Sequence, residues 1–215
     1  MKFLFCAVFI TFCKLTLASR ILVLYPTPSK SHVIALHGLS TTLAEKGHDV
    51  TVFSSFPLEK KLKNHRDIKL PLSKEAASYA DELLKNPKKS MIPSMFKMIE
   101  MTIRSGKDLM EMPEYTNVLK EEKFDLVVIG LFMNNFLLGV GDHFKCPTMM
   151  MSAAGAFTFT NLLFGNPLEV SAVPHMMTFK SGRMNFWDRV MNFVAYGFDL
   201  TMSCYLDYKQ QKVYE

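Results

Sequence analysis

The segment "PSKSHVIALHGL" at residues 28–39 contains the side chain best suited to chemistry in this chain. His32 follows an apolar run at residues 21–24 that predicts a buried strand, and Ser31 directly precedes it. A histidine with an ordinary pKa of about 6.5 exchanges a proton near neutral pH, so it can serve as a general base. A capping or partly buried histidine at the start of a helix would show the same local sequence, and both interpretations stay open at this point.

The elements around His32 predict an alternation of strands and helices. Leu36, Leu39 and Leu43 form an apolar stripe at helical spacing, and a β-branched strand follows at residues 49–55. Strand, helix and strand of this length are typical of a parallel βαβ unit. Further strands are expected at residues 67–72, 124–130 and 147–153, and helices over most of 73–123, at 134–144 and from 184 onward. The predicted fold class is α/β, with a Rossmann-like, doubly wound parallel sheet that binds ligands at the carboxyl ends of its strands.

The first eighteen residues predict a secretory signal peptide rather than part of the fold. Lys2 is followed by an apolar stretch and then by small residues up to Ala18. An uncleaved membrane anchor is the alternative. Removing Lys2 and Lys14 leaves 23 basic against 20 acidic residues, so the net charge falls from +5 to +3. This balance does not favour a nucleic-acid partner. Residues 19–215 are expected to form one domain.

A metal site is not predicted, because no Cys/His pairs occur at the short spacing of zinc sites. Cys146 and Cys204 remain after the signal and could form a disulfide, but the sequence does not fix their separation. The other histidines suggest structural roles. We expect His37 and His65 to be solvated surface residues and His48 to pack locally.

Four segments in order resemble the N-terminal half of the UDP-glycosyltransferases, the UDP-glucuronosyltransferase group, in its insect-like form. They are the Ser31–His32 pair, "GHDVTVFSS" at 47–55, "KFDLVVIG" at 123–130 and "GNPLEVSAVPHMMTFKSGRMNFWDRV" at 165–190, with a mild departure at Asn185. The resemblance implies two Rossmann-like domains that face a cleft, of which this chain matches the acceptor-binding one. It also implies the lumen of the endoplasmic reticulum and, in full-length relatives, a membrane anchor.

The resemblance implies an inverting transfer of glucose or glucuronate to small lipophilic acceptors. UDP-glucose or UDP-glucuronate would be the co-substrate, and no bound cofactor is expected. His32 would be the general base, and Ser31 would lie in the acceptor site. Aromatic residues that follow strand ends are expected to line that site. They are Phe132, Phe136, Phe157 and Phe159.

One position departs from the family pattern. The carboxylate that orients the base is expected six residues after Phe124, and that position is Gly130. Asp125 lies at the start of the strand and is expected to make local contacts, and nothing in the sequence brings Asp142 to the base. Either the site is impaired, or another group or a water molecule orients His32.

The sequence up to Glu215 shows no donor-site motif and no tail anchor, so we expect a fragment or short form that is inactive alone. The alternative function is a non-catalytic lumenal module that binds hydrophobic ligands, or that pairs with full-length relatives as a homo- or hetero-oligomer. Methionines at 91–112 and 149–151 fit core filling or an adaptable acceptor pocket. The basic run at 59–69 fits a solvated face or a membrane-surface contact.

Overall fold

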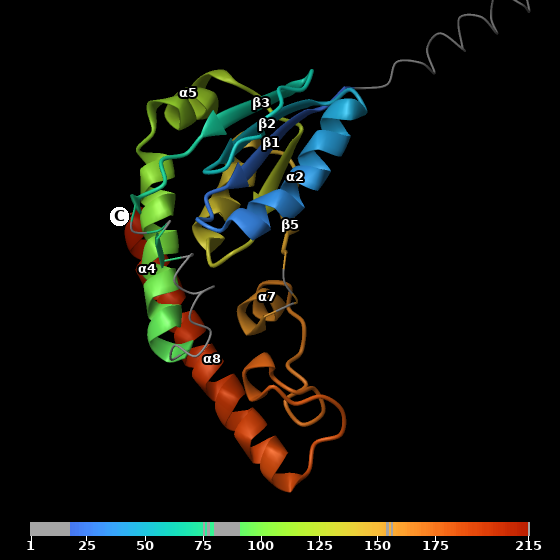
Figure 1. The fold of residues 1–215 in the computed structure, drawn as a ribbon, viewed down its shortest axis with the longest axis vertical. Coiled ribbons are helices and arrows are strands. Elements are labelled where there is room, and N and C mark those ends of the chain that lie inside the picture. The colour runs from blue at the N-terminus through green and yellow to red at the C-terminus, as the bar shows by residue number, and fades with distance from the viewer. Residues whose placement is uncertain are drawn as a thin grey trace, which may run out of the picture.

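The chain folds around a five-stranded parallel sheet, shown in Figure 1. The structure is a computed structural model that describes residues 18–74, 76, 78–79, 91–153, 155 and 157–214. The strands are β1 (Arg20–Tyr25), β2 (Asp49–Ser54), β3 (His65–Lys69), β4 (Leu126–Gly130) and β5 (Thr148–Met151). Their spatial order is β3-β2-β1-β4-β5, and every pairing is parallel. The chain therefore winds outward in both directions from β1, which confirms the predicted doubly wound α/β fold.

The helices account for most of the connections. They are α2 (Lys30–Glu45), α4 (Met91–Met110), α5 (Pro113–Glu121), α6 (Gly139–Phe144), α7 (Thr158–Leu163) and α8 (Phe186–Tyr214), with short 3₁₀ turns η1 (Asn135–Leu138) and η2 (Met176–Thr178). The helix predicted at residues 134–144 is thus divided between η1 and α6. The sequence predicted no helix between residues 155 and 174, and α7 lies there. Residues 1–17 of the predicted signal peptide, and much of the helix predicted near residues 74–85, lie outside the described residues.

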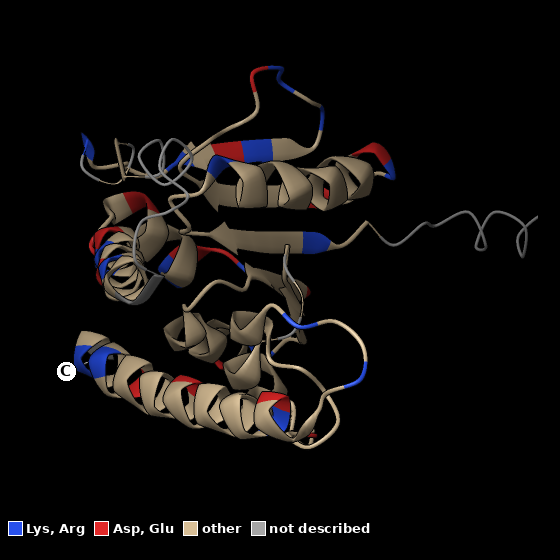
Figure 2. Cartoon of the chain, turned by 60° about the horizontal axis from the view of Figure 1, so that its bottom comes forward, with Lys and Arg blue, Asp and Glu red and all other residues tan. Residues whose placement is uncertain are grey.

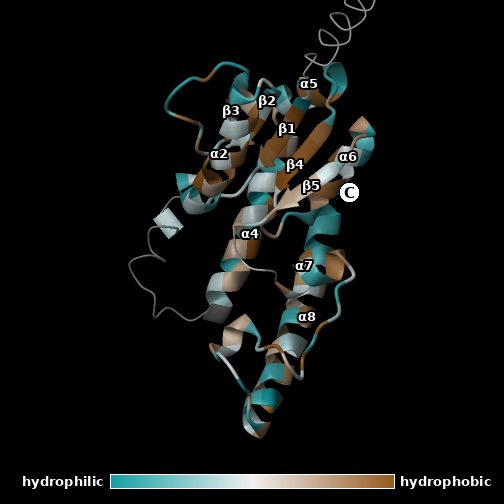
Figure 3. Cartoon of the chain, turned by 90° about the vertical axis from the view of Figure 1, so that its right-hand side faces the viewer, coloured by the Kyte–Doolittle hydropathy of each residue, from teal (hydrophilic) through white to brown (hydrophobic). Residues whose placement is uncertain are grey.

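Alternate residues of β1 face opposite sides of the sheet, and both sides are covered. Ile21, Val23 and Tyr25 pack against α2. Leu22 and Leu24 belong to the core on the other face, with residues of α5, η1 and α6. All five side chains are at most 2% exposed, and burial of a large apolar side chain stabilises the fold by about 1.5–3 kcal/mol. The apolar colour of β1 and β4 in Figure 3 marks this double burial.

Helices α4 and α8 form a second packed unit that extends past the carboxyl ends of the strands (Figure 1). Ile99 of α4 packs with Met202 and Leu206 of α8 in a small apolar cluster. Over most of its length α8 carries few charged residues (Figure 2). Within the described part of the chain, no helix combines the length and the apolar character needed to cross a bilayer.

Candidate functional site

His32 lies where β1 gives way to α2, at the carboxyl edge of the sheet. A turn of Pro26–Ser29 ends the strand, and the helix begins at Lys30, so His32 is in its first turn. Ser29 has the extended N-cap conformation, but its side chain does not bond a backbone N–H of the helix. Its Oγ instead lies 2.9 Å from Nδ1 of His32. The residue that would usually cap the helix therefore positions the histidine ring.

The ring of His32 is half-buried against an aromatic neighbour. Phe132, just after β4, meets it edge to face with ring centroids 4.8 Å apart. Burial lowers the pKa of His32 below its usual value, because removal of water disfavours the charged imidazolium. The ring is therefore neutral at pH 7. A neutral ring has one nitrogen able to accept a proton, which is the state that a general base requires.

The hydroxyl groups around Nδ1 of His32 bear on which ring nitrogen can accept a proton from a substrate. Ser31 Oγ lies 3.2 Å from Ser29 Oγ and 3.4 Å from Nδ1 of His32. If Nδ1–H donates to Ser29 and Ser29 donates onward to Ser31, the lone pair is on Nε2. The described residues provide no hydrogen-bond partner for Nε2 of His32. The geometry thus leaves this nitrogen available to a substrate.

Gly130 occupies the position where the family pattern has a carboxylate, and the structure closes that position. A Cβ atom placed there would lie 2.5 Å from the Tyr25 ring and 2.7 Å from the Leu36 side chain. Tyr25 is fully buried, and its hydroxyl donates to the Leu36 carbonyl at 3.3 Å. No described carboxylate bonds to His32. The sequence left two possibilities open, an impaired site or another group or a water molecule that orients His32. The group observed beside the histidine is the Ser29 hydroxyl.

The other predicted aromatic residues lie apart from His32. Phe136 is 3% exposed and packs in the core, because η1 turns it under the sheet. This core role leaves it no surface for an acceptor. Phe157 and Phe159 stack on each other with centroids 5.5 Å apart, next to and within α7. Of the predicted acceptor residues, the structure brings only Ser31 and Phe132 to the histidine.

The prediction that His37 and His65 are solvated is wrong. His37 is 7% exposed, and the His65 side chain is 1% exposed. Helix α2 covers the edge strand β3, so it buries histidines that the polar local sequence placed at the surface. His48 packs locally as predicted, with Nδ1 accepting the Ser19 N–H at 3.2 Å.

A second histidine environment was not apparent from the sequence. Nε2 of His175 lies 3.0 Å from Asp199 of α8, and its Nδ1 accepts the Met177 N–H at 3.2 Å. Asn192 accepts the His175 backbone N–H. The partners come from a helix that follows a long loop, so no short-range spacing signals the pair. Cys146 and Cys204 are both free thiols.

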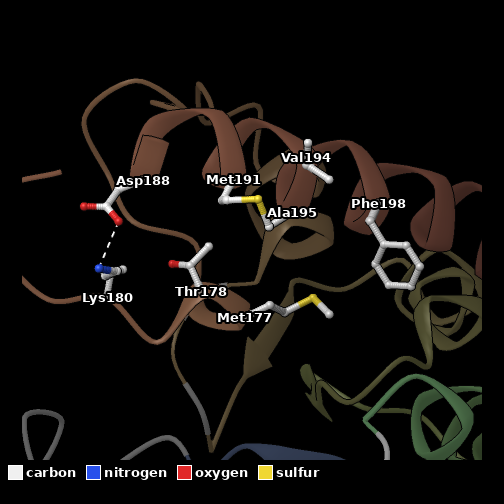
Figure 4. A pocket seen from close by; sticks show the side chains of 8 residues that line it. All are labelled: Met177, Thr178, Lys180, Asp188, Met191, Val194, Ala195 and Phe198. Carbon is white, nitrogen blue, oxygen red and sulfur yellow. Dashed lines mark ion pairs between the residues drawn. The ribbon is translucent and has the colours of Figure 1, made fainter. Parts of the chain in front are cut away.

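A pocket of about 530 Å³ lies between η2 and α8, as Figure 4 shows. Met177, Met191 and Phe198 give it apolar walls, and the Lys180–Asp188 ion pair of 2.9 Å stands at one end. The hydrogen bond from Lys180 lowers the pKa of the Asp188 carboxyl. The pocket has the size and composition of a small-molecule site. Its methionines, Met177 and Met191, lie outside the methionine clusters at 91–112 and 149–151 that the sequence suggested for a pocket.

A doubly wound parallel sheet with a histidine at the carboxyl edge of its central strand defines a Rossmann-like domain with a ligand site at that edge. The family model described as "UDP-glucoronosyl and UDP-glucosyl transferase" matches residues 20–215. The chain therefore belongs to this transferase family, as its motifs predicted.

The individual relatives are longer proteins. UDP-glycosyltransferase UGT4 of Dactylopius coccus is 28% identical over 202 residues, which cover 93% of this chain and 39% of the relative. UDP-glucosyltransferase 2 of the same organism is 25% identical, with 89% of this chain and 37% of the relative covered. UDP-glucuronosyltransferase 3A1 of Homo sapiens is 26% identical, with 83% and 36% covered. The chain thus spans less than two fifths of the length of these relatives. No solved structure matches it.

Proposed function

We propose that this chain is the acceptor-binding half of a UDP-glycosyltransferase, which transfers glucose or glucuronate to small lipophilic acceptors. The observation that carries the proposal is the placement of His32 at the carboxyl edge of β1, with Nδ1 held by Ser29. The family match over residues 20–215 supports the reaction class. The UDP-sugar would be bound by a donor half, in the part of the longer relatives that this chain does not match. No bound cofactor is needed.

In the proposed step, His32 acts on the hydroxyl group of the acceptor. The acceptor oxygen forms a bond with the anomeric carbon of the sugar as the bond from that carbon to UDP breaks, with inversion. The acceptor proton passes to Nε2 of His32 as the new bond forms. Such base catalysis contributes roughly 10²–10⁴-fold. Ser29 can accept from Nδ1–H but carries no negative charge, so it stabilises the imidazolium less than a carboxylate would.

The proposed acceptor site begins at the same edge. Ser31 and Phe132 lie beside the histidine, and a half-buried aromatic ring such as Phe132 suits an apolar or aromatic alcohol. We place the protein in the secretory lumen, associated with the membrane in its full-length form. The predicted signal segment is the support for this location.

The test is a chimera of residues 20–215 with the donor half of a longer relative. His32→Gln should lower the kcat for transfer from UDP-glucose or UDP-glucuronate to a phenol by roughly 10²–10⁴-fold. His48→Gln is the matched control, because among the described residues the His48 side chain bonds the Ser19 backbone N–H and not His32, and it should leave kcat unchanged. Full activity in the His32→Gln chimera would contradict the proposed base.

A second candidate function is that of a non-catalytic module that binds hydrophobic ligands, either alone or paired with a longer relative. The apolar pocket between η2 and α8 favours it, as does the side chain of Phe179, which is 83% exposed. In a Nile red binding assay, Phe198→Ala should weaken affinity about tenfold while Trp187→Ala should not. Pocket binding without any transfer by the chimera would favour this second function.

A further inference from the structure

Three potential metal ligands converge where α2 covers the edge strand of the sheet. His37 is on α2, and His65 and Asp67 are on β3. Because side chains two residues apart on a strand point to the same face, His65 and Asp67 both face the helix. One ligand atom from each residue lies within 4.8 Å of the others. His37 is 28 residues before His65 in the sequence, so no short-range spacing of histidines signals the cluster.

The cluster is largely closed to solvent. His37 is 7% exposed, and the side chains of His65 and Asp67 are 1% and 17% exposed. Buried polar atoms normally have hydrogen-bond partners, and leaving one unpartnered destabilises the fold. Among the described residues, no hydrogen bond satisfies Nδ1 of His37, Nδ1 of His65 or Oδ1 of Asp67. Three such atoms thus gather in one largely buried cluster.

The backbone fixes which nitrogen of His37 carries the lone pair. Nε2 lies 2.8 Å from the carbonyl oxygen of Phe56. A carbonyl only accepts, so Nε2 must carry the hydrogen and donate it. In the neutral ring Nδ1 is therefore an unprotonated acceptor. It lies in the cluster without a donor among the described residues.

A similar argument applies to His65. The Ser40 hydroxyl lies 3.2 Å from the His37 carbonyl, and if it donates its one hydrogen there, its oxygen accepts from His65 Nε2 at 3.1 Å. The lone pair of neutral His65 is then on Nδ1, 3.2 Å from Oδ2 of Asp67 and not aligned for a hydrogen bond with it. Asp67 Oδ2 also accepts the Leu58 N–H at 3.4 Å. Lone pairs thus face one another, and a cation between them would relieve the repulsion.

We propose that His37, His65 and Asp67 form a site for a divalent transition-metal ion of the zinc type. Two imidazole nitrogens and a carboxylate oxygen are ligands that Zn²⁺ takes, with bond lengths of about 2.0–2.2 Å. Both rings donate their other N–H to an oxygen, as ligating histidines do. The solvent-facing side of Asp67 leaves room for a water molecule as fourth ligand. The ion would join α2, the segment after β2 and the edge strand.

The test uses the tag-free full chain after removal of metal with a chelator. Calorimetric titration with Zn²⁺ should show one site, and Mg²⁺ should bind at least about a hundredfold more weakly, because the nitrogen ligands disfavour it. Co²⁺ should give the visible absorption bands of tetrahedral coordination. Zn²⁺ at about a hundred times its Kd should raise the Tm by roughly 5–10 °C.

Variants locate the site. His37→Gln, His65→Gln and Asp67→Asn should each weaken Zn²⁺ binding at least about a hundredfold. His143→Gln is the matched control, because His143 also contacts a backbone carbonyl, that of Leu119, and lies outside the cluster. If a histidine variant fails to fold, the test rests on Asp67→Asn, because Asp67 has the most exposed side chain of the three. No binding by the wild type, or unchanged binding by Asp67→Asn, would overturn the proposal.

Discussion

His32 and His175 show how differently this chain uses the same side chain. His175 has the carboxylate that a catalytic histidine commonly needs, Asp199 at 3.0 Å, but its other nitrogen accepts the Met177 N–H. His32 has only the Ser29 hydroxyl at 2.9 Å, and the described residues give its Nε2 no partner. The histidine with a carboxylate thus has no nitrogen to spare, and the one with a spare nitrogen lacks a carboxylate. A free nitrogen at a strand's carboxyl edge therefore identifies the candidate base better than a His–Asp pair does.

The largest effect is expected from giving His32 the family's carboxylate. Gly130→Asp should not restore a better site, because its Cβ would meet Tyr25 and Leu36 in the buried core. Overpacking and burial of a carboxylate should cost at least about 3 kcal/mol and lower the Tm by about 10 °C. The control is Gly38→Ala, which has open space and should raise the Tm slightly. A Gly130→Asp chimera that is as stable as the wild type and transfers the sugar faster would contradict the conclusion that position 130 has no room for a side chain.

A smaller loss of stability is expected at the other histidine. Asp199→Ala should destabilise the fold by about 1–3 kcal/mol, because buried His175 loses its charged acceptor and keeps only the Thr158 hydroxyl at 3.3 Å. This corresponds to a Tm lowered by roughly 3–10 °C. The kcat of the folded chimera should stay unchanged. Loss of transfer without loss of folding would mean that His175, not His32, does the chemistry.

The Ser29 contact should matter to rate more than to stability. Ser29→Ala frees Nδ1 of His32 and should lower kcat about tenfold, the equivalent of one ordinary hydrogen bond in the transition state. Ser31→Ala, whose oxygen is 3.4 Å from the same nitrogen, is the matched control and should have a smaller effect. Steady-state rates of the Ser29→Ala and Ser31→Ala chimeras measure the two effects. Equal losses would remove the special role of Ser29.

The smallest effect is a pH dependence of folding. Burial lowers the pKa of His32 in the folded state, so the unfolded chain binds the proton first as pH falls below about 6.5. This contribution to stability is present above that pH and is lost as pH falls through the folded pKa. Urea unfolding at pH 7.5 and 5.5 should show a smaller decrease for His32→Gln than for the wild type. An identical decrease would show that His32 is not desolvated.

The sequence predicted the parts of the fold that local patterns determine. The apolar run before His32 and the leucine stripe after it identified β1 and α2, and the order of strands implied the doubly wound sheet. The burial of His37 by β3 is a tertiary effect, so the polar sequence around it was misleading. The core position of Phe136 depends on the turn η1, which no periodicity signals.

Of the residues around the candidate base, the sequence named His32, Ser31 and Phe132 but not Ser29. His32 follows a strand end, and this alone placed it at the ligand edge. Ser29 and Ser31 both lie near the start of α2, and it is Ser29, with its extended backbone, whose oxygen lies 2.9 Å from Nδ1. The closure of Gly130 by Tyr25 arises across neighbouring strands β1 and β4, which sequence spacing does not reveal.

The most direct test is the pH dependence of kcat/KM for the chimera and its Ser29→Asp variant. Ser29→Asp provides a carboxylate at a helix N-cap, where Asp is favoured, without filling the core as Gly130→Asp does. The rate should fall on the acid side with an apparent pKa below about 6.5 in the wild type, and the variant should raise that pKa by about 1–3 units. An acid limb that is absent, or that Ser29→Asp does not move, would contradict a base at His32 oriented through Ser29.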